Sequence, residues 1–111
     1  MSDITDATTI CHLNDQLRRS LAGGVLVMTP GVIALGHACQ LTILDATAKF
    51  DAFDESNNPQ GEHDFGVVEV AGERLLFKID YYDRDLSAHS PDPTDPSVTT
   101  RVLTIMLAQE Y

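Results

Sequence analysis

The chain has 111 residues, of which 43% are hydrophobic, so its length and composition predict one globular domain, 1–111, with a buried core. Seventeen acidic residues face only seven basic ones, and the net charge of −10 argues against direct binding to nucleic acid, whose phosphates such a surface repels. No apolar run approaches the ~20 residues of a membrane span, and the segment "MSDITDATTI" lacks the basic and apolar regions of a signal peptide. We therefore expect a cytoplasmic protein that does not contact membranes.

The first half of the chain predicts two helices with a hairpin between them. A helix is expected over 4–21, where apolar residues recur at steps of three and four. The segment "VLVMTPGVIAL" has two apolar runs around a Pro-Gly pair, which predicts a hairpin of strands 25–29 and 32–35. Helical spacing returns over 40–53, and the turn-forming residues of 54–61 predict a loop. The apolar stripe of the first helix consists of Ile10, Leu13, Leu17 and Leu21.

The second half predicts another hairpin and a final helix. The segment "DFGVVEVAGERLLFKIDYYD" has two β-rich runs around Gly72, which is typical of two strands joined by a tight turn. A proline-rich stretch follows, and Asp95-Pro96 then resembles a helix cap, so we expect a helix over 96–110 that is apolar on more than one face. The predicted fold is α+β, with an antiparallel sheet of about four strands from two hairpins packed against helices. Its core should include Phe50, Phe53, Phe77, Ile79, Val102 and Ile105.

The second hairpin also predicts a polar cluster at one end of the sheet. If the turn centres near Gly72, paired residues have numbers that sum to about 143 to 145, and cross-strand neighbours lie ~5 Å apart. The segment "GEHDFG" then lies beside "DYYD", and we expect His63 to reach a carboxylate of Asp64, Asp80 or Asp83, directly or through water. The candidate polar cluster consists of Glu62, His63, Asp64, Asp80, Tyr82 and Asp83.

Three interpretations of this cluster are open. The acidic side chains could cap turns by accepting hydrogen bonds from backbone N–H groups, as short acidic residues often do. They could bind Mg²⁺, Mn²⁺ or Ca²⁺, which prefer oxygen ligands. His63 could also work with Asp64 or Asp80 in proton transfer. We favour the first interpretation and predict no metal and no cofactor, since Cys11 and Cys39 lack the spacing of a zinc site.

Three segments carry a resemblance to a known family. "FDAFDESNNPQGEHDFG", "FKIDYYD" and "SPDPTDPSVTTRVLTIMLAQEY" resemble domain of unknown function 3768, a family of small bacterial proteins that are frequent in alphaproteobacteria and often encoded on plasmids and integrative elements. The resemblance runs from "LNDQLRR" to the C-terminus. Asn58 stands where an acidic residue is expected, and Phe77 where tryptophan is typical. The resemblance implies no catalytic residues, but it implies an accessory role in mobile DNA.

Two functional hypotheses arise from the charge and this context. The first is a non-enzymatic, acidic protein-interaction module of mobile elements, whose partner has a basic surface and whose role could be to antagonise a host nucleic-acid-binding defence protein. The alternative is a small metal-dependent or acid/base enzyme centred on His63 and the neighbouring carboxylates.

Overall fold

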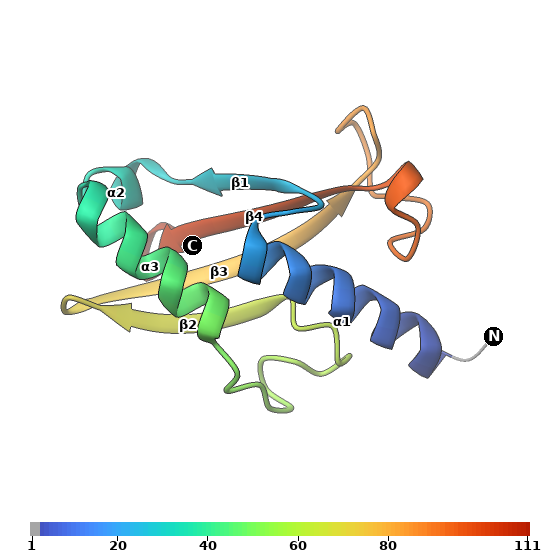
Figure 1. Ribbon diagram of the computed structural model, residues 1–111, viewed down its shortest axis with the longest axis horizontal. Helices are drawn as coiled ribbons and strands as arrows, with labels where there is room; N and C mark the ends of the chain where they lie inside the picture. Colours follow the sequence, from blue (N-terminus) through green and yellow to red (C-terminus); the bar gives the residue numbers. More distant parts are fainter. Residues whose placement is uncertain (1–2) are drawn as a thin grey trace.

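A computed structural model describes residues 3–111 of the chain, so Met1 and Ser2 of the expected 1–111 domain lie outside the described residues. The fold is α+β and consists of a four-stranded sheet with helices packed on it (Figure 1). The elements in chain order are α1 (Asp3–Ser20), β1 (Val25–Met28), α2 (Pro30–Ile33), α3 (His37–Lys49), β2 (Phe65–Val70), β3 (Glu73–Tyr82) and β4 (Thr100–Leu107), with 3-10 turns at Pro96–Val98 and Ala108–Glu110.

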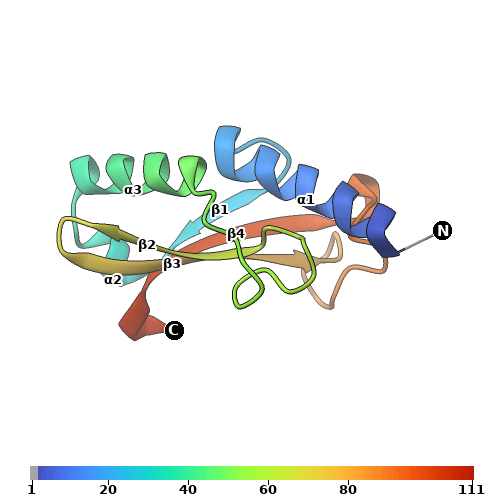
Figure 2. The same cartoon turned by 90° about the horizontal axis from the view of Figure 1, so that it is seen from below.

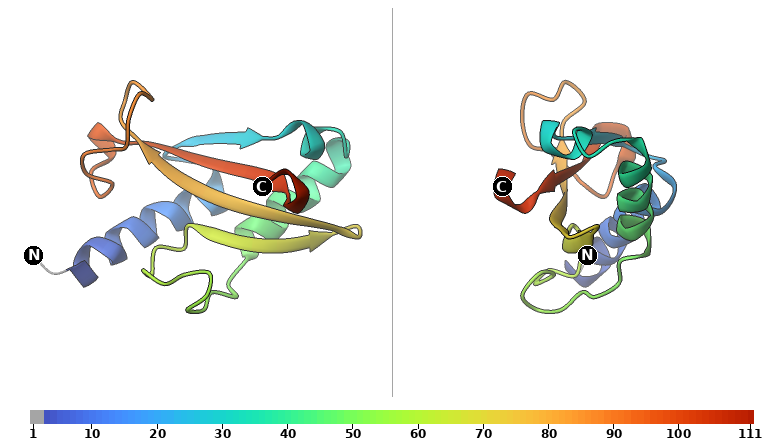
Figure 3. Two further views of the ribbon diagram at one scale, coloured as in Figure 1. Left: turned by 180° about the vertical axis from the view of Figure 1, so that it is seen from behind. Right: turned by 90° about the vertical axis from the view of Figure 1, so that its left-hand side faces the viewer.

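The molecule has two layers. Helices α1 and α3 lie on one face of the sheet, and the C-terminal turn projects from the opposite face (Figures 2 and 3). The strand order is β1-β4-β3-β2, so β1 and β2 form the edges and β4 is an inner strand. We call the face without α1 and α3 the open face. Residues that are paired across strands share a face, which places Val25, Val27, Lys78, Asp80, Tyr82, Val102 and Thr104 on the open face.

The core lies between the helices and the sheet, and it confirms most of the predicted core residues. Phe77, Ile79 and Ile105 are buried. Phe50 and Phe53 are half-buried and pack against this core, with the Phe50 ring 5.3 Å from the Phe77 ring. They follow α3 rather than end it, because Phe50 already has an extended backbone. Val102 is the exception, since it lies on the open face next to Val25.

One predicted hairpin is present and the other is not. Strands β2 and β3 pair antiparallel, with Phe65 opposite Lys78, as the turn at Gly72 predicts. The hairpin of 25–29 and 32–35 is wrong, because Thr29-Pro30-Gly31 begins the short helix α2 instead of a tight turn. Proline at the first helical position has the fixed φ that a helix needs, and α2 buries Val32. Strand β1 therefore pairs in parallel with β4, far along the chain, and the sheet is mixed rather than purely antiparallel.

The predicted helix over 96–110 is also wrong. Asp95 does accept a hydrogen bond from the Ser97 N–H at 2.9 Å, but it caps only the 3-10 turn. The following segment "TRVLTIML" is strand β4. Threonine, valine and isoleucine favour strands, and β4 alternates between the buried Arg101, Leu103 and Ile105 and the less buried Val102 and Thr104. Strand β4 has a strand on both sides, and its last three residues are buried. A buried strand of this kind has a nearly continuous run of apolar residues, which by its pattern alone cannot be distinguished from a buried helix.

Candidate functional site

The six residues of the predicted polar cluster lie in three separate environments. Four of them, Glu62, Asp64, Asp80 and Tyr82, line one pocket of about 320 Å³ together with Gln60, Ile79, Tyr81 and His89. Asp83 closes a turn, and its carboxylate accepts hydrogen bonds from the backbone N–H and the hydroxyl of Ser87 at 2.9 and 3.1 Å. His63 contacts helix α1. The hairpin thus brings four of the six residues together, but it leaves out Asp83 and the His63 imidazole.

The backbone of the loop before β2 explains why His63 leaves the cluster. His63 has a left-handed backbone with φ of 57°, and its N–H donates to the Asn58 side-chain oxygen at 2.9 Å. The alternating geometry of a strand therefore does not extend to residue 63, and β2 begins only at Phe65. The Asp64 carbonyl still accepts the Ile79 N–H at 2.8 Å, so the pairing of the two strands ends there.

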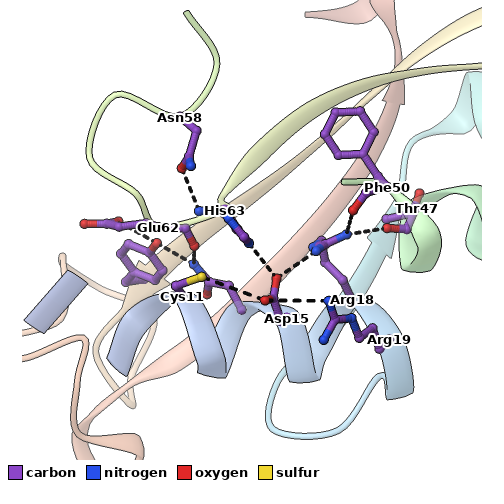
Figure 4. A network of polar contacts seen from close by, with 11 residues as sticks. Cys11, Asp15, Arg18, Arg19, Thr47, Phe50, Asn58, Glu62 and His63 are labelled. Atoms are coloured by element: carbon purple, nitrogen blue, oxygen red, sulfur yellow. Dashed lines mark hydrogen bonds and ion pairs between the residues drawn. The ribbon is translucent and has the colours of Figure 1, made fainter. Parts of the chain in front are cut away.

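His63 contacts a carboxylate, but not one of those predicted. Its Nδ1 lies 3.0 Å from Oδ1 of Asp15 on α1 (Figure 4). Its ring stacks on Phe53 with the centroids 3.9 Å apart. The direct partner is therefore Asp15, and a contact through water with Asp64, Asp80 or Asp83 stays a prediction. The sequence pattern did not indicate Asp15, because it predicted that the buried side of α1 is an apolar stripe. The buried side also carries polar residues, and Leu21, which was expected in the stripe, is 41% exposed.

Arg18 connects this site to helix α3. Its guanidinium donates to the Asp15 carboxylate at 2.7 Å and to the carbonyls of Thr47 and Phe50 at 2.7 and 3.0 Å. The guanidinium also lies 5.2 Å from the Phe53 ring centroid and 5.5 Å from that of Phe77, distances at which a cation and an aromatic face attract each other. The Arg18 side chain has no exposed surface, so its charge depends on Asp15 for compensation.

A second set of contacts from α1 holds the loop before β2 and the start of β4. The buried Asn14 amide donates to the Glu62 carbonyl at 2.9 Å and to the Tyr81 hydroxyl at 2.8 Å. The Tyr81 hydroxyl donates to the Glu62 carboxylate at 2.8 Å, and Arg101 donates to the Asn14 side-chain oxygen at 2.8 Å. Burial raises the pKa of Tyr81, and the Glu62 carboxylate adds to this effect, so Tyr81 stays a neutral hydrogen-bond donor.

The Asp15 carboxylate is the ionised centre of the helix-side site. Burial alone would raise the pKa of Asp15, but the hydrogen bonds from Arg18 and His63 lower it. Cys11, one helical turn before Asp15, has its Sγ 3.8 Å from Asp15 Oδ2. Burial and the Asp15 charge raise the pKa of this thiol, so Cys11 is not activated as a nucleophile. Among the described residues, Cys11, Asp15 and His63 offer ligand atoms that all lie within 4.8 Å of one another.

The pocket beside the end of β3 has a different electrostatic character. Burial raises the pKa of Asp64, and the neighbouring Glu62 and Asp80 carboxylates raise it further. Lys78 is paired with Asp80, with their charged atoms 2.7 Å apart. Its charge compensates one carboxylate, so the pocket keeps an excess of negative charge. A cationic group that enters the pocket would relieve this repulsion.

An apolar pocket adjoins the acidic pocket. It has a volume of about 360 Å³ and is lined by Val25, Val27, Tyr82, Leu86 and Val102. Tyr82 lines both pockets. Val25, Val27 and Leu86 are 45%, 42% and 58% exposed, which is high for large apolar side chains. The open face therefore offers an apolar hollow directly beside a negatively charged one.

The comparison with protein families matches the model of the family described as Protein of unknown function (DUF3768) over residues 28–110. The chain belongs to this family. The match begins at Met28, so α1, with Cys11, Asp15 and Arg18, lies outside the matched region, whereas the pockets on the sheet lie mostly within it. No curated protein and no solved structure matches the chain. Within residues 3–111, none of the helices has the length and hydropathy needed to cross a membrane.

Proposed function

We propose that this DUF3768 protein is a non-enzymatic protein-interaction module that binds a partner with a basic surface through its open face. The observation that carries the proposal is the pair of adjacent pockets that share Tyr82, one apolar and one lined by the carboxylates of Glu62, Asp64 and Asp80. A partner that places an apolar side chain beside a lysine or arginine would fill both. Apolar anchors surrounded by charged groups are typical of interfaces in which the anchor supplies affinity and the charges supply specificity.

The overall charge supports the same class of partner. A net charge of −10 attracts basic proteins over a distance of about 8 Å at physiological salt, and it increases the rate of encounter. Nucleic-acid-binding proteins have such basic surfaces. In the setting of mobile DNA that the family resemblance implies, the finer form of the proposal is that the protein occupies the nucleic-acid-binding surface of a host defence protein and so antagonises it.

The enzyme alternative centred on His63 has less support. The His63 imidazole pairs with Asp15 and has one ring face against Phe53, while the carboxylates expected to work with it line a separate pocket. The imidazole and the carboxylates expected to exchange protons with it therefore lie in different parts of the molecule. The neighbouring Cys11 thiol also has a raised pKa, which argues against covalent catalysis at this place.

The proposal predicts how capture of the partner responds to mutation and salt. In pull-downs from host cells at low salt, the wild type should retain a protein of basic isoelectric point, and Val27→Asp should reduce its recovery at least ~tenfold, a loss of about 1.4 kcal/mol of binding free energy. The reason is that the substitution places a charge in the apolar hollow. Recovery by the wild type should also decrease steeply as salt is raised, because salt screens the attraction.

The matched control is Leu41→Asp, which changes a 53% exposed leucine on α3, on the helix side of the molecule. This variant should capture the same protein as the wild type. Capture that is insensitive to salt, or that is lost in Leu41→Asp and kept in Val27→Asp, would reject the open face as the binding surface.

A further inference from the structure

We propose that Cys11, Asp15 and His63 form a binding site for a transition-metal dication of the zinc class. This site is separate from the open face and from the partner proposed above. Cys11 and Asp15 are four residues apart on α1, so their side chains project from the same side of the helix. His63 reaches them from the loop before β2, and Figure 4 shows the three side chains directed toward one another.

The distances between the donor atoms suit a tetrahedral ion. Sγ of Cys11 lies 3.8 Å from Oδ2 of Asp15, and Nδ1 of His63 lies 3.0 Å from Oδ1 of the same carboxylate; with one ligand atom taken from each residue, all three lie within 4.8 Å of one another. Zinc bonds of ~2.3 Å to sulfur and ~2.0–2.2 Å to nitrogen or oxygen separate neighbouring ligand atoms by roughly 3.2–3.6 Å at the tetrahedral angle. Small rotations of the three side chains are therefore enough to surround an ion, and a water molecule can supply the fourth ligand.

The surroundings already hold the ligands in place. His63 is held by its N–H bond to Asn58 and by stacking on Phe53. Arg18 donates to Oδ1 of Asp15 at 2.7 Å, whereas Oδ2, the oxygen that faces Cys11, has the exposed Arg19 guanidinium at 3.9 Å, a longer contact that an ion can replace. Hydrogen bonds of this kind to a ligand carboxylate are typical of metal sites, where they fix its orientation. The positive charge of Arg18 repels a metal cation, but this repulsion is reduced because two backbone carbonyls accept hydrogen bonds from the guanidinium.

The donor set determines the class of metal. One sulfur, one nitrogen and one oxygen suit zinc or cobalt, whereas magnesium and calcium prefer oxygen ligands alone. On binding, the Cys11 thiol gives up its proton to solvent and the resulting thiolate bonds to the ion. His63 also gives up the Nδ1 proton that it donates to Asp15 and keeps a proton on Nε2, so that Nδ1 offers a lone pair, while Asp15 already carries its negative charge. The ion would join α1 to the loop before β2, which otherwise meet where Asn14 donates to the Glu62 carbonyl and where the Asp15 carboxylate accepts from His63.

Cobalt chloride, added to protein freed of metal with a chelator, tests the site. We expect one Co²⁺ per chain and a thiolate-to-cobalt charge-transfer absorption in the near ultraviolet. Cys11→Ser should lose this absorption, and His63→Gln should weaken Co²⁺ binding by at least ~tenfold. Cys39→Ser is the matched control, because Cys39 is the other free cysteine and is half-buried like Cys11; it should keep the full signal.

A second measurement does not depend on the folding of any variant. In the wild type, ZnCl₂ should slow the alkylation of Cys11 by iodoacetamide and leave that of Cys39 unchanged, as followed by mass spectrometry of the peptides. Charge-transfer absorption that persists in Cys11→Ser, or its absence in the wild type together with equal alkylation of Cys11 with and without zinc, would overturn the proposal.

Discussion

Replacing Asp15 with alanine is expected to lower the free energy of unfolding by about 3 kcal/mol, because it leaves a buried arginine without its counter-charge. The Arg18 side chain has no exposed surface, and the side chain of Asp15 is only 13% exposed. Arg18 would retain two carbonyl acceptors for Nη1, but Nη2 would lose the Asp15 carboxylate and the charge would not be neutralised. Urea denaturation of the two proteins at neutral pH measures the difference.

The matched control for this prediction is Asp45→Ala. Asp45 pairs with Lys49 on the surface of α3, with 60% and 75% of the two side chains exposed. Exposed pairs of this kind contribute at most about 1 kcal/mol, so the variant should unfold almost like the wild type. Equal losses in Asp15→Ala and Asp45→Ala would contradict the view that the Asp15–Arg18 pair anchors α1.

The same ion pair predicts a dependence of stability on pH. Burial alone would raise the pKa of Asp15, but hydrogen bonds from Arg18 and His63 lower it in the folded state. Asp15 therefore adds stability above the ordinary carboxyl pKa of ~3.9, and this stability is lost as the pH falls through the lower folded value. The unfolding curves of the wild type and Asp15→Ala should approach each other as the pH decreases below about 4.

Truncation of Phe77 to alanine should lower the free energy of unfolding by about 3–5 kcal/mol, the usual loss for a buried phenylalanine. Phe77 is fully buried and contacts the Phe50 ring that follows α3, so its loss opens a cavity between the two layers. Gly66 faces Phe77 on β2, and a Cβ added there would lie 2.4 Å from the Phe77 ring. Gly66 has no side chain that could fill the space left by the ring. Thermal and chemical unfolding should agree on the loss.

Phe65→Ala provides the comparison for Phe77. Phe65 is half-exposed, and its ring lies 6.2 Å from that of the exposed Tyr111. Its truncation should cost less than half as much, because water can fill the space it leaves. A loss of less than about 1 kcal/mol in Phe77→Ala would contradict the assignment of the β3 core face.

The sequence predicts the local elements of this fold better than its long-range pairings. The hairpin around Gly72 is specified by adjacent strands and a tight turn, and its register results from them. Strand β4 is different, because it pairs with β1 and β3 through contacts that no local pattern contains. The Asp95-Pro96 cap is a real signal, but it specifies only one turn. The residues after that turn are extended because they form backbone hydrogen bonds with β1 and β3. The local propensity of the sequence contains no information about this pairing.

The candidate site shows the same distinction. The pairing of β2 with β3 brings Glu62, Asp64, Asp80 and Tyr82 to one pocket, as expected from the hairpin. Asp15 could not be paired with His63 from the sequence, since the two are 48 residues apart and meet only because α1 packs across the end of the sheet. The available signal was the set of polar residues at helical spacing beside Leu17, namely Cys11, Asn14, Asp15 and Arg18.

Photo-crosslinking in host cells tests the central claim, that the open face binds a basic protein. A photoreactive amino acid would replace Val27 on the open face in one variant and Leu41 on α3 in another; their side chains are 42% and 53% exposed. We predict that the variant at position 27 crosslinks one protein of basic isoelectric point and that the variant at position 41 does not. Crosslinking of the same protein from position 41 but not from position 27, or of none from position 27, would contradict the account.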